Sequence, residues 1–203
     1  MRDVAIKKIC RRLEEEHNTV LKDIVALDFF ARTGDWQTSH YASKVKKVHA
    51  WEIDPRHEQT LKDNLPIGSE IKIGNSFHFA SSTNEKFDMI VIDNPQMCFG
   101  LDNRYCEHFD ALDPCLALFK NTTGIMIFNI KTEPFNYSNK LSWQERRNNF
   151  YSLDDASCLS EQFVISFYEK YFLDRGYKTN FSFLEQRPQE PGLYAYTTQL
   201  VHL

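Results

Sequence analysis

Four acidic or amide side chains follow short apolar runs in this 203-residue chain: Asp28, Glu52 and the adjacent Asp93 and Asn94. In open α/β sheets, ligands bind just outside the carboxyl ends of the parallel strands. Carboxylate and amide oxygens placed there accept hydrogen bonds from a ligand and orient a reacting group. The sequence therefore predicts a ligand site at one sheet edge, with Asp93 and Asn94 contacting the substrate.

Asp28 begins a turn of mostly small residues that ends at Gly34, and we expect a helix over residues 35–45. A strand, an acid, a turn and a helix together present a ligand to a helix N-terminus. Glu52 follows this turn by about twenty residues, which is the spacing of a carboxylate that binds a ribose diol. Alternatively, Glu52 and Asp54 only cap the next helix.

A third short strand, Ile71–Ile73, is followed by Gly74–Phe77. Asn75 could hydrogen-bond the edge of an adenine ring and Phe77 could pack against it. Taken on their own, these residues are more readily explained as a simple turn.

These residues need an alternating α/β scaffold to bring them together. Apolar runs alternate with helical patterns as far as residues 124–130, which predicts five strands separated by helices. The last two expected strands, 178–184 and 194–201, are joined by a short turn and therefore form an antiparallel hairpin. Residues 1–20 are expected to form an N-terminal helical extension.

Residues 131–157 are polar, aromatic and too long for an ordinary connection, so we expect an irregular lid or specificity loop there. Its Trp143, Arg146 and Arg147 have side chains that stack on bases or meet phosphates. Scaffold roles fit these three residues equally well.

Composition indicates one soluble domain over residues 1–203. No apolar run approaches the roughly 20 residues of a membrane span, and the N-terminus lacks the apolar core of a signal peptide. The net charge of −4 argues against avid, non-specific nucleic-acid binding, although a local basic groove remains compatible with it.

The five cysteines are scattered and include no C-x-x-C pair, so they are interpreted as reduced thiols of a cytoplasmic protein. Cys98, Cys106, His108 and Cys115 do not have the spacing of a common zinc module. No metal site is expected.

Together these motifs resemble those of class I S-adenosylmethionine-dependent methyltransferases, over roughly residues 24–130. The resemblance implies an α/β, Rossmann-like methyltransferase fold with a mostly parallel seven-stranded sheet and a C-terminal antiparallel hairpin. Asp28–Gly34 resembles the family's D-x-F-A-G-T-G cofactor loop, and Glu52–Asp54 resembles the segment with its ribose-binding acid. Gly74–Phe77 is similar to the family's G-D-x-F segment at the adenine. Asp93–Gln96 is similar to the [D/N]-P-P-[Y/F] turn of members that methylate amino groups.

The resemblance also implies the roles of individual residues. Asp93, Asn94 and Lys131 are the implied catalytic residues: acceptors position an amine, whereas a hydroxyl needs a base such as Lys131 or Asp93. The residues implied to bind S-adenosylmethionine are Asp28, Phe30, Ala31, Arg32, Gly34, Glu52, Ile53, Asn75, Ser76, Phe77 and Asp93.

Two positions depart from the family pattern. Arg32 stands where a glycine is usual, and Gln96 stands where an aromatic residue usually stacks on a flipped base. A second resemblance, of Asp28–Gln37 to the D-x-x-A-x-P-G-G-[FW]-x-Q loop, is to ribose 2′-O-methyltransferases. Their Lys-Asp-Lys-Glu set would here include Asp93 and Lys131, with Glu185 or Glu190 as the acid.

We therefore expect a methyltransferase that uses S-adenosylmethionine and acts on a nucleic-acid acceptor, RNA or DNA, with a base amine favoured over a ribose 2′-hydroxyl. A small-molecule acceptor is the main alternative. A binding module that keeps the fold without the chemistry is another, suggested by Arg32 and Gln96.

Overall fold

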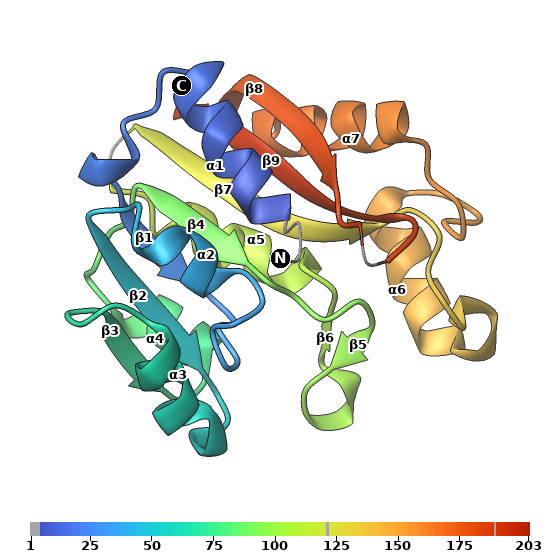
Figure 1. Ribbon diagram of the computed structural model, residues 1–203. Helices are drawn as coiled ribbons and strands as arrows, with labels where there is room; N and C mark the ends of the chain where they lie inside the picture. The colour runs from blue at the N-terminus through green and yellow to red at the C-terminus, as the bar shows by residue number, and fades with distance from the viewer. Residues whose placement is uncertain (1–4, 121, 189) are drawn as a thin grey trace.

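The computed structural model describes residues 5–120, 122–188 and 190–203. A seven-stranded sheet with the order β3-β2-β1-β4-β7-β9-β8 forms its centre (Figure 1). The first five strands in this order pair in parallel, and β9 pairs antiparallel with both β7 and β8. The predicted fold class is confirmed. The strands are β1 Val25–Asp28, β2 Lys47–Glu52, β3 Glu70–Ile73, β4 Met89–Ile92, β7 Thr123–Lys131, β8 Tyr177–Gln186 and β9 Leu193–His202.

Helices cover both faces of the sheet, and each face has its own apolar core (Figure 1). One core holds α1 Ala5–Glu15, α2 Thr38–Ala42 and α3 Glu58–Asn64 against the sheet, and the other holds α4 Ser76–Ser82, α5 Phe109–Leu116, α6 Leu141–Tyr151 and α7 Glu161–Leu173. Short 3₁₀ turns lie at Leu21–Asp23, Pro55–His57, Leu101–Asn103 and Tyr137–Asn139. Among the described helices, none has both the length and the apolar character needed to cross a membrane.

Strand β4 lies at the middle of the sheet, and its four side chains, Met89 to Ile92, are all fully buried. A strand covered on both faces reads as a continuous apolar run, which is what its sequence shows. Its neighbour β1 aligns Leu27 with Ile90. The carboxyl ends of β1 and β4 therefore lie side by side, as the prediction of a shared site requires.

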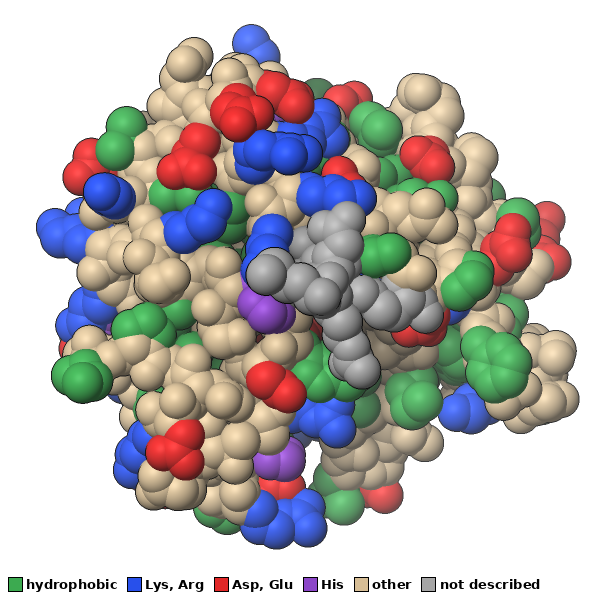
Figure 2. Space-filling view, viewed as in Figure 1, with side chains coloured by type: hydrophobic (Ala, Val, Ile, Leu, Met, Phe, Trp, Pro, Cys, Tyr) green, Lys and Arg blue, Asp and Glu red, His purple; other side chains and the backbone are tan. Residues whose placement is uncertain are grey.

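Charged side chains of both signs are interspersed on the face that α1 covers (Figure 2). Two ion pairs, Arg11–Glu15 within α1 and Arg12–Glu16 at its C-terminal end, each join residues four apart in the chain. Exposed pairs of this kind contribute little to stability, and they break up any continuous basic surface on this helix.

The helix expected over residues 35–45 is only five residues long, because α2 begins at Thr38 and ends at Ala42. The three residues before it form turns. The Thr33 hydroxyl donates to the Asp35 carboxylate. The side chain of Gln37, the residue before the helix, donates to Asp93. Two further elements were not expected: helix α4, and a small hairpin made of β5 Cys98–Phe99 and β6 Tyr105–Cys106.

The expectation of an irregular segment over residues 131–157 is wrong, because α6 forms there and packs into the core. Trp143 and Arg147 are buried, and both donate to Glu107 Oε1, over 2.9 and 2.6 Å. Arg146 pairs instead with Asp110 at 2.8 Å. The scaffold role is thus confirmed for Trp143 and Arg147, and neither is exposed to meet a base or a phosphate.

Candidate active site

A pocket of 280 Å³ lies where the carboxyl ends of β1, β4 and β7 meet the connection between β8 and β9. The segments after β1 and β4 form two of its walls, and the β8–β9 connection forms a third. It is lined by Phe30, Arg32, Trp36, Asp93, Asn94, Pro95, Gln96, Asn129, Arg187, Glu190 and Leu193.

Asp93 is the centre of a polar network in this pocket. Its Oδ1 accepts hydrogen bonds from the side chains of Gln37 at 2.8 Å, Asn129 at 2.6 Å and Arg187 at 3.3 Å. Among the described residues, no donor contacts the other oxygen, Oδ2. The three donors hold the carboxylate in one orientation and leave Oδ2 free to receive a donor from a ligand.

Asn94 is buried, and its side chain joins β4 to β7. Its Oδ1 accepts from the backbone N–H of Asn129 at 3.0 Å, and its Nδ2 donates to the Asn129 carbonyl at 3.3 Å. The Asn94 side-chain amide thus makes both hydrogen bonds to the Asn129 backbone, one to the N–H and one to the carbonyl, as a neighbouring β-strand does. Asn94 lines the pocket, but its polar atoms are committed to holding Asn129 and the strand ends in place.

Asp28 is fully buried at the end of β1, with Thr38 Oγ1 donating to its Oδ2 at 2.5 Å. Burial, together with the negative charge of Asp93, raises the pKa of Asp28 to about 7. The Thr38 hydroxyl and the Phe30 N–H oppose this shift because they donate to the ionised form. Asp28 is therefore expected to ionise much closer to neutral pH than an ordinary aspartate does.

Glu52 holds the turn after β1 against the end of β2. Its Oε2 accepts from the backbone N–H of Arg32 at 2.7 Å and its Oε1 from that of Asp54 at 2.8 Å. Each oxygen keeps a second lone pair for a ligand hydroxyl. Asp54 itself accepts from the N–H of Arg56, so the capping alternative is confirmed for Asp54.

The turn from Ala31 to Gly34 closes by a hydrogen bond of 2.8 Å between the Gly34 N–H and the Ala31 carbonyl. Gly34 has φ +74°, and a Cβ there would lie 2.9 Å from Leu61 Cδ1. Arg32 also has a positive φ, of 51°. The loop is therefore shaped by its backbone, and Gly34 is the position that no other residue fits without strain.

Of the predicted adenine contacts, Asn75 is the N-cap of α4. Its Oδ1 accepts from the N–H groups of Phe77 and His78, which leaves its Nδ2 as the group that can reach an adenine edge. The Phe77 ring is stacked on Tyr105 of the unexpected hairpin, with centroids 4.0 Å apart. An adenine placed here must share this aromatic cluster with Tyr105. Ser76 is buried beside it.

Two exposed apolar side chains flank the site. Ile53, just after Glu52, is 66% exposed, and Trp36 is 51% exposed at the pocket wall. The Arg32 guanidinium lies 5.1 Å from the Trp36 ring centroid and that of Arg187 lies 5.8 Å from it. An aromatic ring next to two cations is suited to a planar or anionic ligand.

Lys131 lies at the end of β7, where its ammonium pairs with Glu190 at 2.7 Å. Glu190 lines the pocket, while the Lys131 side chain is almost completely buried. Glu185 is not part of this site, because it pairs with Lys8 and Arg12 of α1. Of the two acids considered for the ribose alternative, Glu190 is therefore the one beside Lys131.

The structure adds Gln37, Asn129 and Arg187 to the residues that the sequence singled out. Asn129 had a local signal, because it is the one polar residue in the apolar run 124–130. Gln37 was visible only as the last residue of the second resemblance. Arg187 had no local signal, since it lies in a surface turn that the fold brings over Asp93.

Solved structures of methyltransferases share this fold across nearly the whole chain. The N-methyltransferase NodS from Bradyrhizobium japonicum superposes with a TM-score of 0.59 at 12% identity, covering 97% of this chain and 93% of that one. A candidate RNA methyltransferase from Pyrococcus horikoshii gives 0.58 at 14% identity, covering 98% and 84%. TYW2 from M. jannaschii, solved in complex with AdoMet, gives 0.54 at 15% identity, covering 95% and 76%.

No protein-family model matches the sequence, and no curated protein matches it either. The structural matches show that the chain has the fold of the class I S-adenosylmethionine-dependent methyltransferases, as its motifs predicted. Its sequence identity to these three structures is 12–15%. Identity at this level establishes the fold.

Proposed function

We propose that this protein is a methyltransferase that uses S-adenosylmethionine to methylate an amine, most naturally the exocyclic amine of a nucleic-acid base. The observation that carries the acceptor class is an excess of unpaired hydrogen-bond acceptors around Asp93. An amine carries several N–H donors on one atom, whereas a hydroxyl carries one.

Three oxygen atoms make up this excess. Asp93 Oδ2 receives no donor from the described residues, and the side-chain oxygens of Gln37 and Gln96 are buried without a hydrogen-bond partner. The orientation of each amide follows from its NH₂ group, since Gln37 donates to the Asp93 carboxylate and Gln96 to the Asn94 carbonyl. Buried acceptors without donors cost free energy, so a ligand that supplies donors is favoured.

The residues around the turn after β1 fit the cofactor. Gly34 gives the turn a positive φ that lets it close tightly after β1, Glu52 offers two oxygens at the end of β2, and Asp28 offers a buried carboxylate for an ammonium group. S-adenosylmethionine supplies an electrophilic methyl group on a sulfonium. We infer cofactor-binding roles for these residues and for Phe30, Ala31, Arg32, Ile53, Asn75, Ser76, Phe77 and Asp93.

The protein's task in such a transfer is to align the acceptor and exclude water. Asp93 Oδ2 would accept an N–H of the acceptor amine and turn the nitrogen lone pair toward the methyl group. Asn94 positions Asn129 and thereby Asp93. Lys131 does not line the pocket and its side chain pairs with Glu190, which is a further reason to favour an amine over a ribose hydroxyl that needs a base.

The nucleic-acid part of the proposal rests on Trp36, which is exposed and lies beside two guanidinium groups. Aromatic rings stack on bases, and arginines pair with phosphates. The alternative acceptor is a small-molecule amine. It is favoured by the net charge of −4 and by the modest 280 Å³ volume of the pocket.

Calorimetric titration with S-adenosylmethionine tests the cofactor, and transfer of a labelled methyl group to RNA, DNA and small amines tests the acceptor. We expect micromolar affinity, weakened at least tenfold by Glu52→Gln and unchanged by the matched cap variant Asp54→Asn. Label recovered in an N-methylated nucleoside, at a rate that falls with rising salt, supports a nucleic-acid acceptor.

Salt-independent transfer to a small amine would replace the nucleic-acid acceptor by the small-molecule one. Cofactor binding without transfer to any amine would contradict the amine proposal. Absence of cofactor binding would leave a binding module with this fold.

A further inference from the structure

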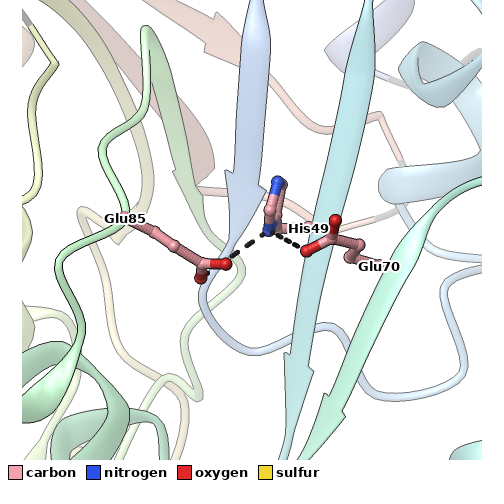
Figure 3. Close-up of side chains that lie close together, drawn as sticks. All are labelled: His49, Glu70 and Glu85. Carbon is pink, nitrogen blue, oxygen red and sulfur yellow. Dashed lines mark ion pairs between the residues drawn. The ribbon is translucent and has the colours of Figure 1, made fainter.

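We propose a second site, for a transition-metal ion such as Zn²⁺, formed by His49, Glu70 and Glu85 on the face of the sheet next to β2 and β3. One ligand atom from each of these residues lies within 4.8 Å of the other two (Figure 3). The inference does not depend on the proposed methyltransferase function.

The three side chains come from elements that the fold holds in register. His49 on β2 is the direct cross-strand partner of Glu70 on β3, and Glu85 lies in the loop that leads to β4. Figure 3 shows His49 Nδ1 directed between the two carboxylates. His49 precedes Glu52 by three residues on the same strand, so their Cα atoms lie about 10 Å apart along β2.

The His49 side chain is 7% exposed, and its Nδ1 is buried without a hydrogen-bond partner. Such a buried polar atom is costly unless something binds it. Burial also lowers the pKa of His49, which favours the neutral form of imidazole that binds metals. The Phe87 ring packs against the imidazole at 5.0 Å and limits its rotation.

The separations between ligand atoms suit a tetrahedral ion. Bonds of about 2 Å in tetrahedral geometry place neighbouring ligand atoms about 3.3 Å apart. His49 Nδ1 lies 3.2 Å from Glu70 Oε2 and 3.9 Å from Glu85 Oε2. One imidazole and two carboxylates favour Zn²⁺ over Mg²⁺ or Ca²⁺, which prefer oxygen ligands alone, and water completes the fourth position.

Two lysines adjoin the cluster and affect it differently. Lys47 contacts Glu70 through Oε1, the oxygen that does not face His49, so it does not compete for the metal. Lys72 contacts Glu85 Oε2 at 2.6 Å, which is the same oxygen that faces His49. The Lys72 ammonium is therefore the group that an ion must displace, and its side chain is exposed enough to move away.

The test is calorimetric titration of the chelator-treated protein with ZnCl₂, and with CoCl₂ as a spectroscopic probe. We expect one micromolar site that His49→Gln weakens at least tenfold. Lys72→Met should strengthen binding several-fold because it frees Glu85. His78→Gln, at an exposed histidine on α4, is the matched control and should change nothing.

Absence of zinc binding, or equal binding by His49→Gln, would overturn the proposal. So would a thiolate-to-cobalt absorption band, because it would place the ion at a cysteine pair such as Cys98 and Cys106, whose sulfurs lie 3.3 Å apart. Should His49→Gln fail to fold, Glu85→Gln in the loop gives the same comparison, and unchanged zinc affinity in that variant would equally reject the site.

Discussion

Arg187 and Asp93 meet over the pocket although 94 residues separate them in the chain, with Nη1 of the arginine 3.3 Å from Oδ1 of the carboxylate. The same Nη1 lies 3.2 Å from Asn129 Oδ1. The contact ties the turn between β8 and β9 to the carboxyl end of β4. The C-terminal hairpin therefore contributes a cation to the site as well as completing the sheet.

We expect Asp93 and Arg187 to be coupled in stability. Asp93→Asn and Arg187→Met should each lower the free energy of unfolding by about 1–3 kcal/mol, because each removes the charged partner of a largely buried group. The double variant should lose less than the sum, with a coupling energy of about 0.5–3 kcal/mol. Urea unfolding of the four proteins measures this cycle.

The more exposed pair Arg175 and Asp113 provides a control cycle away from the pocket. Its coupling should be about 1 kcal/mol or less, since solvent screens it. Strictly additive losses for Asp93 and Arg187 would mean that their contact contributes nothing to the folded state.

Gly34→Ala should weaken binding of S-adenosylmethionine and also destabilise the fold. Its positive φ costs a side-chain-bearing residue about 1–2 kcal/mol, and the new methyl group presses on Leu61. Gly176→Ala is a matched control, because Gly176 has φ +82° and no atom within 4 Å of its Cβ position. We expect both variants to lose stability and only Gly34→Ala to lose at least tenfold in affinity by calorimetry. Equal affinities would show that the turn does not bind the cofactor.

The edge of the sheet at which the site forms could be predicted from sequence because it follows from local patterns. Asp28, Glu52 and Asp93 each end an apolar run, and parallel strands bring such ends to one edge. Their partners depend on long-range register. Nothing near Arg187 indicates that its turn covers Asp93, and nothing near Tyr105 indicates that its ring stacks on Phe77.

The segment over residues 131–157 was misread for a related reason. The sequence does not distinguish a buried arginine from an exposed one. Arg146 and Arg147 are adjacent, and what separates them is the carboxylate with which each pairs. Glu107, 40 residues away, is fully buried beside Arg147, while Asp110 beside Arg146 is partly exposed. The sequence pattern of α6 has no apolar face that would predict which residue is buried.

These two adjacent arginines give the third prediction. Arg147→Met should lower the free energy of unfolding by about 3–5 kcal/mol, because it strands the buried Glu107 carboxylate. It also removes the bonds to the Ala156 and Lys131 carbonyls. Arg146→Met, on the same helix, should cost about 1 kcal/mol or less. Similar losses for both in urea unfolding would contradict a structural role confined to Arg147.

The raised pKa of Asp28 predicts how stability depends on pH. The unfolded chain ionises Asp28 near its ordinary pKa of about 3.9, whereas the folded chain does so near about 7. Between these values the unfolded state binds fewer protons, so this group makes stability fall as pH rises from about 4 to 7 and has no further effect above that. The fall approaches about 1.4 kcal/mol per pH unit in that window.

Asp28→Asn cannot ionise, so the stability of the wild type minus that of this variant should fall through the same window and level off above pH 7. Thr38→Val removes a donor to the ionised carboxylate, so it should raise the pKa of Asp28 and extend the fall to higher pH.

If Asp28 receives the cofactor's ammonium group, affinity for S-adenosylmethionine should increase as Asp28 ionises around pH 7, and Asp28→Asn should abolish that increase. Urea unfolding and calorimetry at pH 5 to 8 measure both effects, and a pH-independent difference between wild type and Asp28→Asn would show that Asp28 ionises alike in the folded and unfolded chains.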